Sequence, residues 1–550
     1  MSWIANARKR LPRRARTLDV ALGALAVIVA IAAVALPLAA GRYPPMVDLP
    51  FHAAQTAALR HYLDPSFHFR EQFELRPFAV PYLSMYAAGA LLMTVLPAVT
   101  AVKMAAGLML LLLPAGLAVM LHGMKKSPLL GLSGLLAVWG PLTHWGFLNF
   151  LGAIGLFAMV VGLSLLVVER PTRGGLAALG LALVALFFTH VFRYPFALAA
   201  VVGAGLVAGK GLRGLRAVAP AALPALGLFG AWMALRPASL RGGLGPLTVD
   251  PTRLGDLVDW LHGSFSDPGE PRALAFGAAT LAVVASACGV AGVVERRSPL
   301  WAGPSPGARA RAAVVALGCA GASLLLFVTL PMQIGDWWYV YPREATAACF
   351  LALALLPDLP RSGVLRAALV AATALASMPM VALVTRSYAA FDDATRDFAA
   401  ITRPLPRGPK LLYLIFDHEG SNRTTSPFTH LPAYVQAELG GSLSYHFAVY
   451  GASPLAYRPR EGRESIVPPP TPPRWESTPQ AFDVRDRGRF FDWFLVRRAD
   501  PPDALFAADP AIVLSSHAGL WWLYRRVDGD GDRASGRAAL SSSSPEGAQL

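Results

Sequence analysis

An acidic residue and a histidine lie four positions apart just after the first apolar segment. The stretch reads Asp48-Leu49-Pro50-Phe51-His52, and Pro50 suits the first turn of a helix with Asp48 near its N-cap. Positions four apart share one face of a helix, so Asp48 can accept a proton from an attacking hydroxyl while His52 orients or assists it. The alternative is an interfacial amphipathic helix that Asp48 merely caps.

Further ionisable and aromatic side chains fall at the ends of apolar segments. They are Arg60, His61, His144, Asn149, His190, Arg193, Trp337, Trp338, Tyr339, Arg343 and Glu344. Ionisable groups near membrane depth usually face an interior cavity, and arginine holds phosphate through paired hydrogen bonds. We therefore predict one cavity in which Arg193 and Arg343 hold an anionic group and the aromatic rings stack on a sugar or line a lipid groove. An aromatic belt and local Arg–Glu or His–Arg pairs stay open as alternatives.

The elements that position these residues are predicted to be membrane helices. Hydrophobic residues make up 55% of the 550 positions and charged residues only 15%, which leaves too little polar surface for a soluble chain of this length. About twelve apolar segments meet the spanning-length rule. They lie near 18–40, 79–97, 102–121, 127–143, 149–168, 175–190, 195–209, 215–236, 273–293, 311–331, 343–357 and 364–384. We predict a polytopic α-helical membrane bundle of about 11–13 transmembrane helices over 18–385.

The net charge of +15 indicates membrane orientation rather than nucleic-acid binding, because the basic residues flank apolar segments in short loops. A basic N-terminus, 1–17, is predicted to be cytoplasmic, with a retained first helix rather than a cleaved signal peptide. The longer connections 41–78, 237–272 and 332–342 are predicted to lie outside. Two full crossings between 79 and 121 would place Lys125–Lys126 outside as well, so one segment there is re-entrant or the helix count is off by one.

A small extracytoplasmic α/β domain is predicted over 386–527, followed by a disordered tail, 528–550. Its expected strands are Lys410–Phe416, Ser444–Tyr450, Phe491–Val496, Ala511–Ser515 and Leu520–Arg525, with a helix over Pro432–Leu439. Asp417-His418-Glu419 is interpreted as a solvated loop. The three cysteines lie inside apolar segments without ligand spacing, which predicts small buried side chains rather than disulfides or metal ligands.

Three short segments carry a family resemblance: Asp48-Leu-Pro-Phe-His, Gly146-Phe-Leu-Asn-Phe and His430-Leu-Pro-Ala-Tyr with Gly440-Gly441. Together with the helix number and the small outer domain, they resemble bacterial membrane proteins of the GT-C superfamily of integral-membrane glycosyltransferases. The resemblance implies a GT-C-like bundle in the bacterial inner membrane and a polyprenyl-phosphate-linked sugar as donor. It also implies that Asp48 is the catalytic base.

Many GT-C members carry a second acidic residue close to the first, whereas here Glu71 and Glu74 are more than twenty residues further on. No cofactor is therefore assigned, and a divalent metal stays open. Membrane lipids and the lipid-linked sugar are the predicted partners, without nucleic acid and without a predicted oligomeric state. A transporter or lipid flippase, and a non-catalytic assembly protein that displays its C-terminal domain, are the alternative functions. The charges cluster at helix ends and no internal repeat is visible, which disfavours transport.

Overall fold

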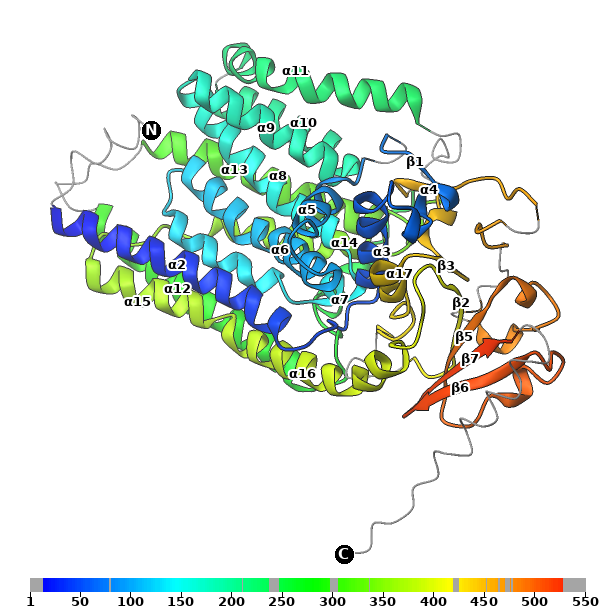
Figure 1. Ribbon diagram of the computed structural model, residues 1–550. Coiled ribbons are helices and arrows are strands. Elements are labelled where there is room, and N and C mark those ends of the chain that lie inside the picture. The colour runs from blue at the N-terminus through cyan, green and yellow to red at the C-terminus, as the bar shows by residue number, and fades with distance from the viewer. Residues whose placement is uncertain are drawn as a thin grey trace, which may run out of the picture.

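The computed structural model describes residues 13–78, 81–209, 211–236, 247–296, 305–335, 337–418, 425–451, 453–462, 465–469, 475 and 478–527. Several predicted features lie outside the described residues: positions 1–12 of the basic N-terminus, 237–246 of the second outer connection, Glu419 and the tail 528–550. The rest forms a helical bundle with a small sheet at one end (Figure 1).

Within the described residues, eight helices are long and apolar enough to cross a membrane. They are built from α2 (Arg13–Ala39), α6 (Ala98–Gly123), α8 (Leu148–Glu169), α10 (Tyr194–Gly203) with its flanking turns, α11 (Leu212–Leu235), α12 (Gly269–Arg296), α13 (Pro306–Thr329) and the pair α15 (Gly363–Leu375) and α16 (Met378–Ile401). Shorter elements fill other predicted segments: α9 (Arg173–Thr189), α14 (Pro342–Ala352) and the 3₁₀ stretch η3 (Pro128–Ala137). The predicted multi-pass membrane bundle is confirmed, with fewer full-length spans than apolar segments.

The predicted segment 79–97 is not a membrane span. It contains α5 (Ser84–Leu92), whose nine residues extend only about 14 Å at 1.5 Å per residue, half the thickness of a bilayer core. A turn over 93–96 and Pro97 at the N-cap of α6 separate the two helices. With one crossing instead of two before Lys125, the conflict in the predicted orientation disappears.

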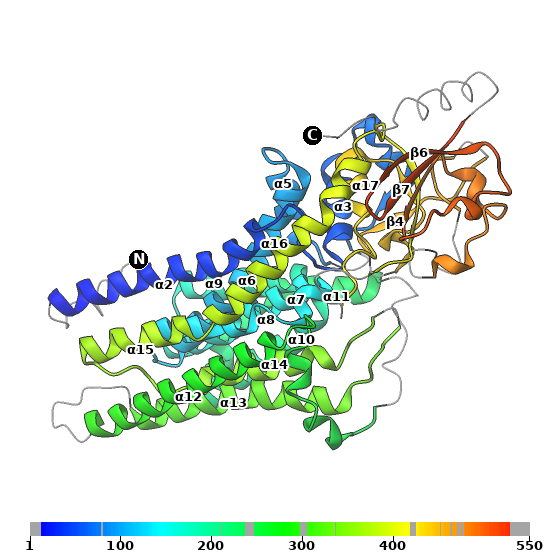
Figure 2. The same cartoon turned by 90° about the horizontal axis from the view of Figure 1, so that it is seen from below.

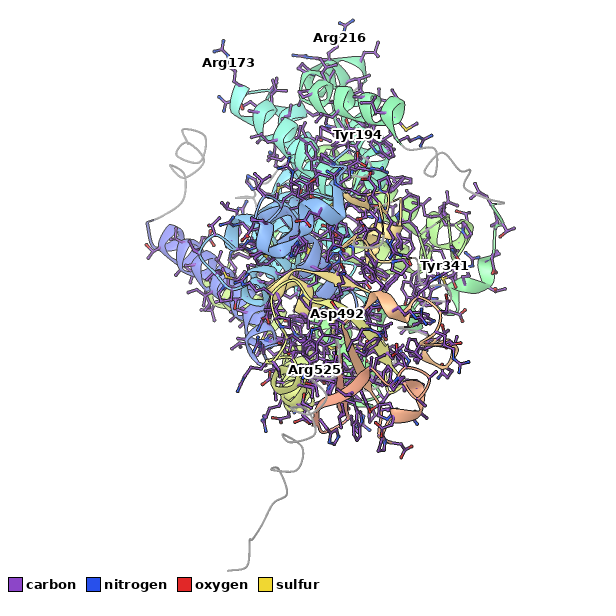
Figure 3. All side chains as sticks on the ribbon, turned by 45° about the vertical axis from the view of Figure 1, so that its right-hand side comes forward. Arg173, Tyr194, Arg216, Tyr341, Asp492 and Arg525 are labelled. Atoms are coloured by element: carbon purple, nitrogen blue, oxygen red, sulfur yellow. The ribbon has the colours of Figure 1, made fainter. Side chains whose placement is uncertain are left out.

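The basic connections meet at the end of the bundle where α2 begins. The Lys126 ammonium donates to the Leu356 carbonyl over 2.8 Å, and the Arg366 guanidinium pairs with Asp19 in α2 over 2.9 Å. This end lies opposite the sheet (Figures 1 and 2). Figure 3 likewise shows Arg173 and Arg216 at the rim of the bundle, away from the part that carries Asp492 and Arg525.

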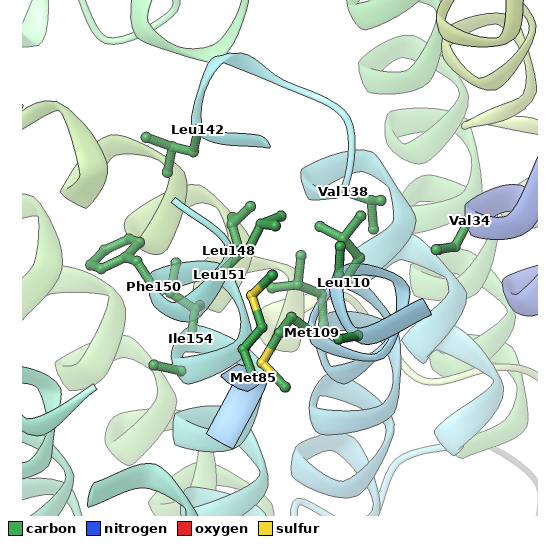
Figure 4. Close-up of a cluster of buried hydrophobic side chains, with 14 of the residues drawn as sticks. Val34, Met85, Met109, Leu110, Val138, Leu142, Leu148, Phe150, Leu151 and Ile154 are labelled. Carbon is green, nitrogen blue, oxygen red and sulfur yellow. The ribbon is translucent and has the colours of Figure 1, made fainter. Parts of the chain in front are cut away.

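The centre of the bundle is apolar and tightly packed. Figure 4 shows a cluster of buried hydrophobic side chains that come from several parts of the bundle, among them Val34, Met85, Met109, Val138 and Ile154. Glycines let α6 and α8 approach closely, because a Cβ at Gly155 would overlap the Leu112 carbonyl and one at Gly116 would overlap the Gly155 carbonyl. Small residues serve the same purpose in many membrane helix pairs.

Replacing Gly155 should therefore unfold the bundle at a lower temperature. We expect Gly155→Ala to cost about 1–3 kcal/mol, since added volume in a packed interface forces the backbones apart. The matched control is Gly227→Ala in α11, where a Cβ would meet nothing within 4 Å and the helix gains propensity. Thermal unfolding in detergent measures both, and equal midpoints would contradict the packing described.

A mixed five-stranded sheet forms the C-terminal part. Its order is β3 (Ser442–Leu443), β2 (Lys410–Ile415), β5 (Trp493–Arg497), β7 (Trp521–Arg526) and β6 (Ile512–Ala518). β2 is parallel to both of its neighbours, and β7 is antiparallel to β5 and β6.

The predicted strand Ser444–Tyr450 is wrong. The chain leaves the sheet after Leu443 and makes a 3₁₀ turn over Phe447–Val449. Rings of this stretch pack on α3 (Leu49–Arg60) instead, with Phe447 at 4.5 Å from Phe51 between ring centroids. Burial of the aromatic side chains against the bundle thus outweighs the strand propensity of the stretch.

The C-terminal part and the connection 41–78 form one layer. Helix α17 (Ala433–Leu439) packs along α3, and β1 (Phe73–Leu75) pairs antiparallel with β4 (Leu455–Tyr457). Ten of the twelve residues of α3 are buried, so the alternative of an interfacial helix is wrong. Since α16 continues from the membrane region to Ile401, the chain enters the sheet directly from a helix end.

Candidate active site

A cavity of about 520 Å³ lies where the helix ends meet the C-terminal part. The bundle contributes Asp48, His52, Asn149, His190, Trp337, Trp338 and Arg343 from the predicted site. Segments that are far apart in sequence therefore converge at the end of the bundle opposite the basic connections.

Asp48 lies at the N-cap of α3, but its side chain does not cap the helix. Its backbone N–H donates to the Trp145 carbonyl over 3.2 Å, and its carbonyl accepts from the His52 N–H over 3.0 Å. The carboxylate is thus left to face the cavity. Burial raises the pKa of Asp48 to about 7, although the positive charge of Arg343 opposes that rise. A carboxylate with a pKa near neutrality suits a general base.

His52 supports this corner of the cavity instead of taking the proton. Its Nε2 lies 3.0 Å from the Gly146 carbonyl, so it donates there, which leaves Nδ1 to accept from the Tyr86 hydroxyl over 2.8 Å. Burial lowers the pKa of His52 to about 4, which keeps the ring neutral. With both nitrogens engaged, His52 is a positioning residue.

Gly146 makes the close approach to Asp48 possible. Its φ of +94° is a left-handed conformation that favours glycine. A Cβ at this position would lie 2.7 Å from the Cβ of Asp48. The turn after α7 (Pro141–Trp145) therefore needs glycine where it meets the start of α3.

Arg343 also lines the cavity, from the first turn of α14. Its Nε and Nη2 donate to the carbonyls of Tyr339 and Trp338 over 3.0 and 2.7 Å, and its guanidinium carbon lies 3.9 Å from the ring centre of Phe147. These contacts fix the plane of the guanidinium while Arg343 lines the cavity. A fixed cation facing an aromatic-lined cavity is suited to a phosphate group.

Arg193 and Glu344 form a buried ion pair next to the cavity. Nη2 of Arg193 lies 3.0 Å from both carboxylate oxygens of Glu344, and the two side chains are 5% and 8% exposed. The local Arg–Glu pair that the sequence left open is thus present. Neither residue lines the cavity, and Arg193 does not share the predicted phosphate site with Arg343.

Removing one partner of this pair should destabilise the protein. Glu344→Gln leaves the Arg193 cation buried without its counter-charge, and such losses typically cost about 3–5 kcal/mol. Thermal unfolding in detergent should show a clearly lower midpoint. The exposed pair of Arg396 and Asp393 provides the control, because Asp393→Gln should change the midpoint little. A Glu344→Gln midpoint equal to that of the wild type would contradict a structural role.

Four other predicted residues lie elsewhere. His144 is fully buried, with Nδ1 2.9 Å from the Gly140 carbonyl. Tyr339 packs between the rings of Trp145 and Trp260, and Arg60 is exposed at the end of α3. His61 stacks on Phe67 at 4.1 Å. None of the four lines the cavity. Their side chains point elsewhere because of their burial and their position around the helix, which the sequence alone does not reveal.

His430 is one of the cavity residues that sequence reasoning missed. Its Nε2 lies 3.9 Å from Oδ1 of Asp48, and its ring packs on Phe51 with centroids 4.8 Å apart. It lies almost four hundred residues from Asp48, so only the packing of α17 on α3 brings the two together. The sequence did carry one signal for His430, because it begins the segment His430-Leu-Pro-Ala-Tyr of the family resemblance. In the structure, Gly146 and His430, the first residues of the other two segments, both lie against Asp48.

The described residues contain no group of three or more His, Cys, Asp or Glu side chains suited to a metal ion. Glu71 and Glu74 have partners of their own, His68 at 3.1 Å and Arg76 at 2.9 Å. The acidic residues considered as companions of Asp48 thus do not line the cavity.

No family model matches the chain, and no curated protein matches it. Among solved structures, it is similar to ArnT from Cupriavidus metallidurans bound to undecaprenyl phosphate, with 14% identity, 93% of this chain and 98% of that chain covered, and a TM-score of 0.49. It is also similar to the arabinofuranosyltransferase AftD from Mycobacteria in two structures, with 14% and 15% identity and TM-scores of 0.46 and 0.48.

The AftD matches cover 94% and 95% of this chain but only 40% and 42% of AftD, so the chain spans less than half the length of that protein. At these identities and TM-scores, the likenesses carry no argument about the chemistry of this chain.

Proposed function

We propose that the chain is a membrane glycosyltransferase that moves a sugar from a polyprenyl-phosphate donor to an acceptor hydroxyl, with Asp48 as the base. The observation that carries the proposal is the cavity that Asp48 lines together with Arg343 and His430. Aromatic rings of the bundle and of the C-terminal part form much of the remaining lining. A base, a fixed cation and aromatic walls are the groups that such a transfer requires.

The chemistry follows from these positions. The acceptor hydroxyl attacks the anomeric carbon, and its proton passes to the Asp48 carboxylate. The bond between that carbon and the phosphate oxygen breaks, and the polyprenyl phosphate leaves with the bonding electrons. Arg343 stabilises the charge that develops on the departing phosphate. Trp337 and Trp338, which line the cavity, offer flat apolar surfaces for the sugar or the first part of the lipid.

The proposal places this site on the extracytoplasmic side of the bacterial inner membrane. Lys126, Arg309 and Arg366 gather at the opposite end of the bundle. Lys126 donates there to the Leu356 carbonyl, and the two arginines pair with Asp358 and Asp19. Basic residues favour the cytoplasmic side. The C-terminal sheet then faces outward with the cavity.

The test is a deletion strain. We expect its membranes to accumulate a polyprenyl-phosphate-linked sugar, detected by lipid mass spectrometry, and its surface glycans to lack the corresponding residue. Complementation with the wild-type gene should reverse both changes. Unchanged lipids together with unchanged glycans would rule out the transferase and favour the transport or assembly alternatives.

The transfer rate should rise with pH around neutrality. With a pKa of about 7 for Asp48, the ionised fraction grows from roughly one tenth at pH 6 to roughly nine tenths at pH 8, and only this form is a base. Transfer by the purified protein should therefore increase about tenfold over this interval and then level off. A rate that is flat or falls from pH 6 to pH 8 would argue against a carboxylate base at this position.

A further inference from the structure

The two walls of the cavity differ in their chemistry, and Asp48 lies where they meet. The bundle wall contributes the Arg343 cation together with Trp145, Trp337 and Trp338. The C-terminal wall contributes mainly hydroxyl groups: Thr425, Ser426, Thr429, Tyr445, Tyr450 and Ser453. His430 is the one basic or acidic residue of that wall among the described residues that line the cavity.

Two buried polar side chains that line this side of the cavity, Gln55 of α3 and Thr425 of the C-terminal part, each have an atom without a hydrogen-bond partner among the described residues. The amide nitrogen of Gln55 donates to the Ser453 hydroxyl over 2.9 Å, but its Oε1 accepts no hydrogen bond, and the Thr425 hydroxyl has no partner either. Each residue is 1% exposed and lines the cavity. Buried polar groups without partners are rare and costly, so each one calls for an explanation.

We propose that the C-terminal wall, together with Gln55 of α3 that donates to Ser453 in it, binds an acceptor that is itself a carbohydrate, with Gln55 and Thr425 as the specificity residues. The inference rests on the proposed transferase function. A sugar brings several neutral hydroxyls that both donate and accept, as Gln55 Oε1 and the Thr425 hydroxyl require. Among the described residues that line the cavity, this wall carries no carboxylate and no arginine that would select a charged acceptor. The rings of Tyr445 and Phe447 offer flat faces for a sugar ring.

The proposal also assigns the donor and the acceptor to different sides of the cavity. The phosphate of the donor lies toward Arg343, the acceptor lies against the C-terminal wall, and Asp48 reaches the hydroxyl between them. His430, 3.9 Å from Asp48 and stacked on Tyr445 at an interplanar angle of 27°, lies on the acceptor side of the base.

The experiment uses the full chain in lipid nanodiscs on an array that carries bacterial oligosaccharides, Ser/Thr peptides and phospholipids. We expect retention on oligosaccharide spots, and about tenfold weaker retention for Thr425→Val and for Gln55→Met, each of which removes a neutral hydrogen-bonding group. The matched control is Thr373→Val, which removes an equally buried hydroxyl that donates to Leu369 in α15 and should leave retention unchanged.

Thermal unfolding of each variant confirms that it is folded. Retention on peptide or phospholipid spots alone, no retention at all, or wild-type retention by folded Thr425→Val and Gln55→Met would each overturn the proposal. Asp48→Asn separates this inference from the transferase proposal, because it should abolish transfer while still being retained by the oligosaccharides.

Discussion

Replacing Asp48 with asparagine should abolish sugar transfer without unfolding the protein. General-base catalysis contributes roughly 10²–10⁴ to a rate, and asparagine keeps the size of the side chain while it loses the ability to accept a proton. We expect a deletion strain that carries Asp48→Asn to show the surface glycans of the deletion strain itself, measured by mass spectrometry with protein levels matched.

Stability separates a catalytic role from a structural one. Because the pKa of Asp48 is raised from 3.8 to about 7 in the folded protein, folding favours the protonated form, and ionisation of Asp48 lowers stability as the pH rises from about 4 to 7. Asparagine stays neutral, so Asp48→Asn should unfold at the wild-type temperature or above at pH 8. The control Asp393→Asn, on the exposed face of α16, should change neither transfer nor stability. Wild-type glycans in the Asp48→Asn strain would contradict the role of the base.

Arg343 is expected to have the second largest effect. Arg343→Gln removes the cation that faces the leaving phosphate, and loss of one such group typically lowers kcat about 10²–10³-fold. Arg343→Lys should recover little, because an ammonium cannot donate to the carbonyls of Trp338 and Tyr339 in one plane and lie flat on Phe147 as well. Steady-state transfer by the purified variants measures both effects.

Arg253 provides a control with the same kinds of contacts outside the cavity. It donates to the carbonyls of Phe327 and Leu330, and its guanidinium carbon lies 4.1 Å from the ring centre of Tyr341. Arg253→Gln should thus cost comparable packing and hydrogen bonding but leave kcat within about twofold, since no phosphate is involved. Equal losses for Arg253→Gln and Arg343→Gln would show that Arg343 acts only through the structure of the turns that it contacts.

The sequence was informative about the bundle for a physical reason: membrane helices need continuous apolar stretches, and these are visible without tertiary information. The membrane span predicted for segment 79–97 was wrong, because an apolar composition does not distinguish a span from a short helix such as α5 that packs among its neighbours. The strand predicted at Ser444–Tyr450 failed in a similar way, because contacts with Phe51, distant in sequence, determine its conformation.

The candidate site was predictable where local pattern and position suffice. Asp48 and Arg343 lie at helix starts at the end of the bundle that carries the sheet, and both line the cavity. Arg193 has the same signature, yet Glu344 neutralises it, which only the packing of two distant helix starts reveals. His430 was hidden for the converse reason: nothing near it in sequence shows that α17 packs on α3 and brings its ring to Asp48.

The most direct measurement supplies the purified full chain with the lipid-linked sugar pool extracted from membranes of the deletion strain, together with glycans from the same cells. The account predicts that the wild-type protein releases free polyprenyl phosphate and adds the sugar to glycan, and that Asp48→Asn does neither. Release of polyprenyl phosphate at wild-type rates by Asp48→Asn, or no conversion of the lipid-linked sugar by the wild-type protein, would contradict it.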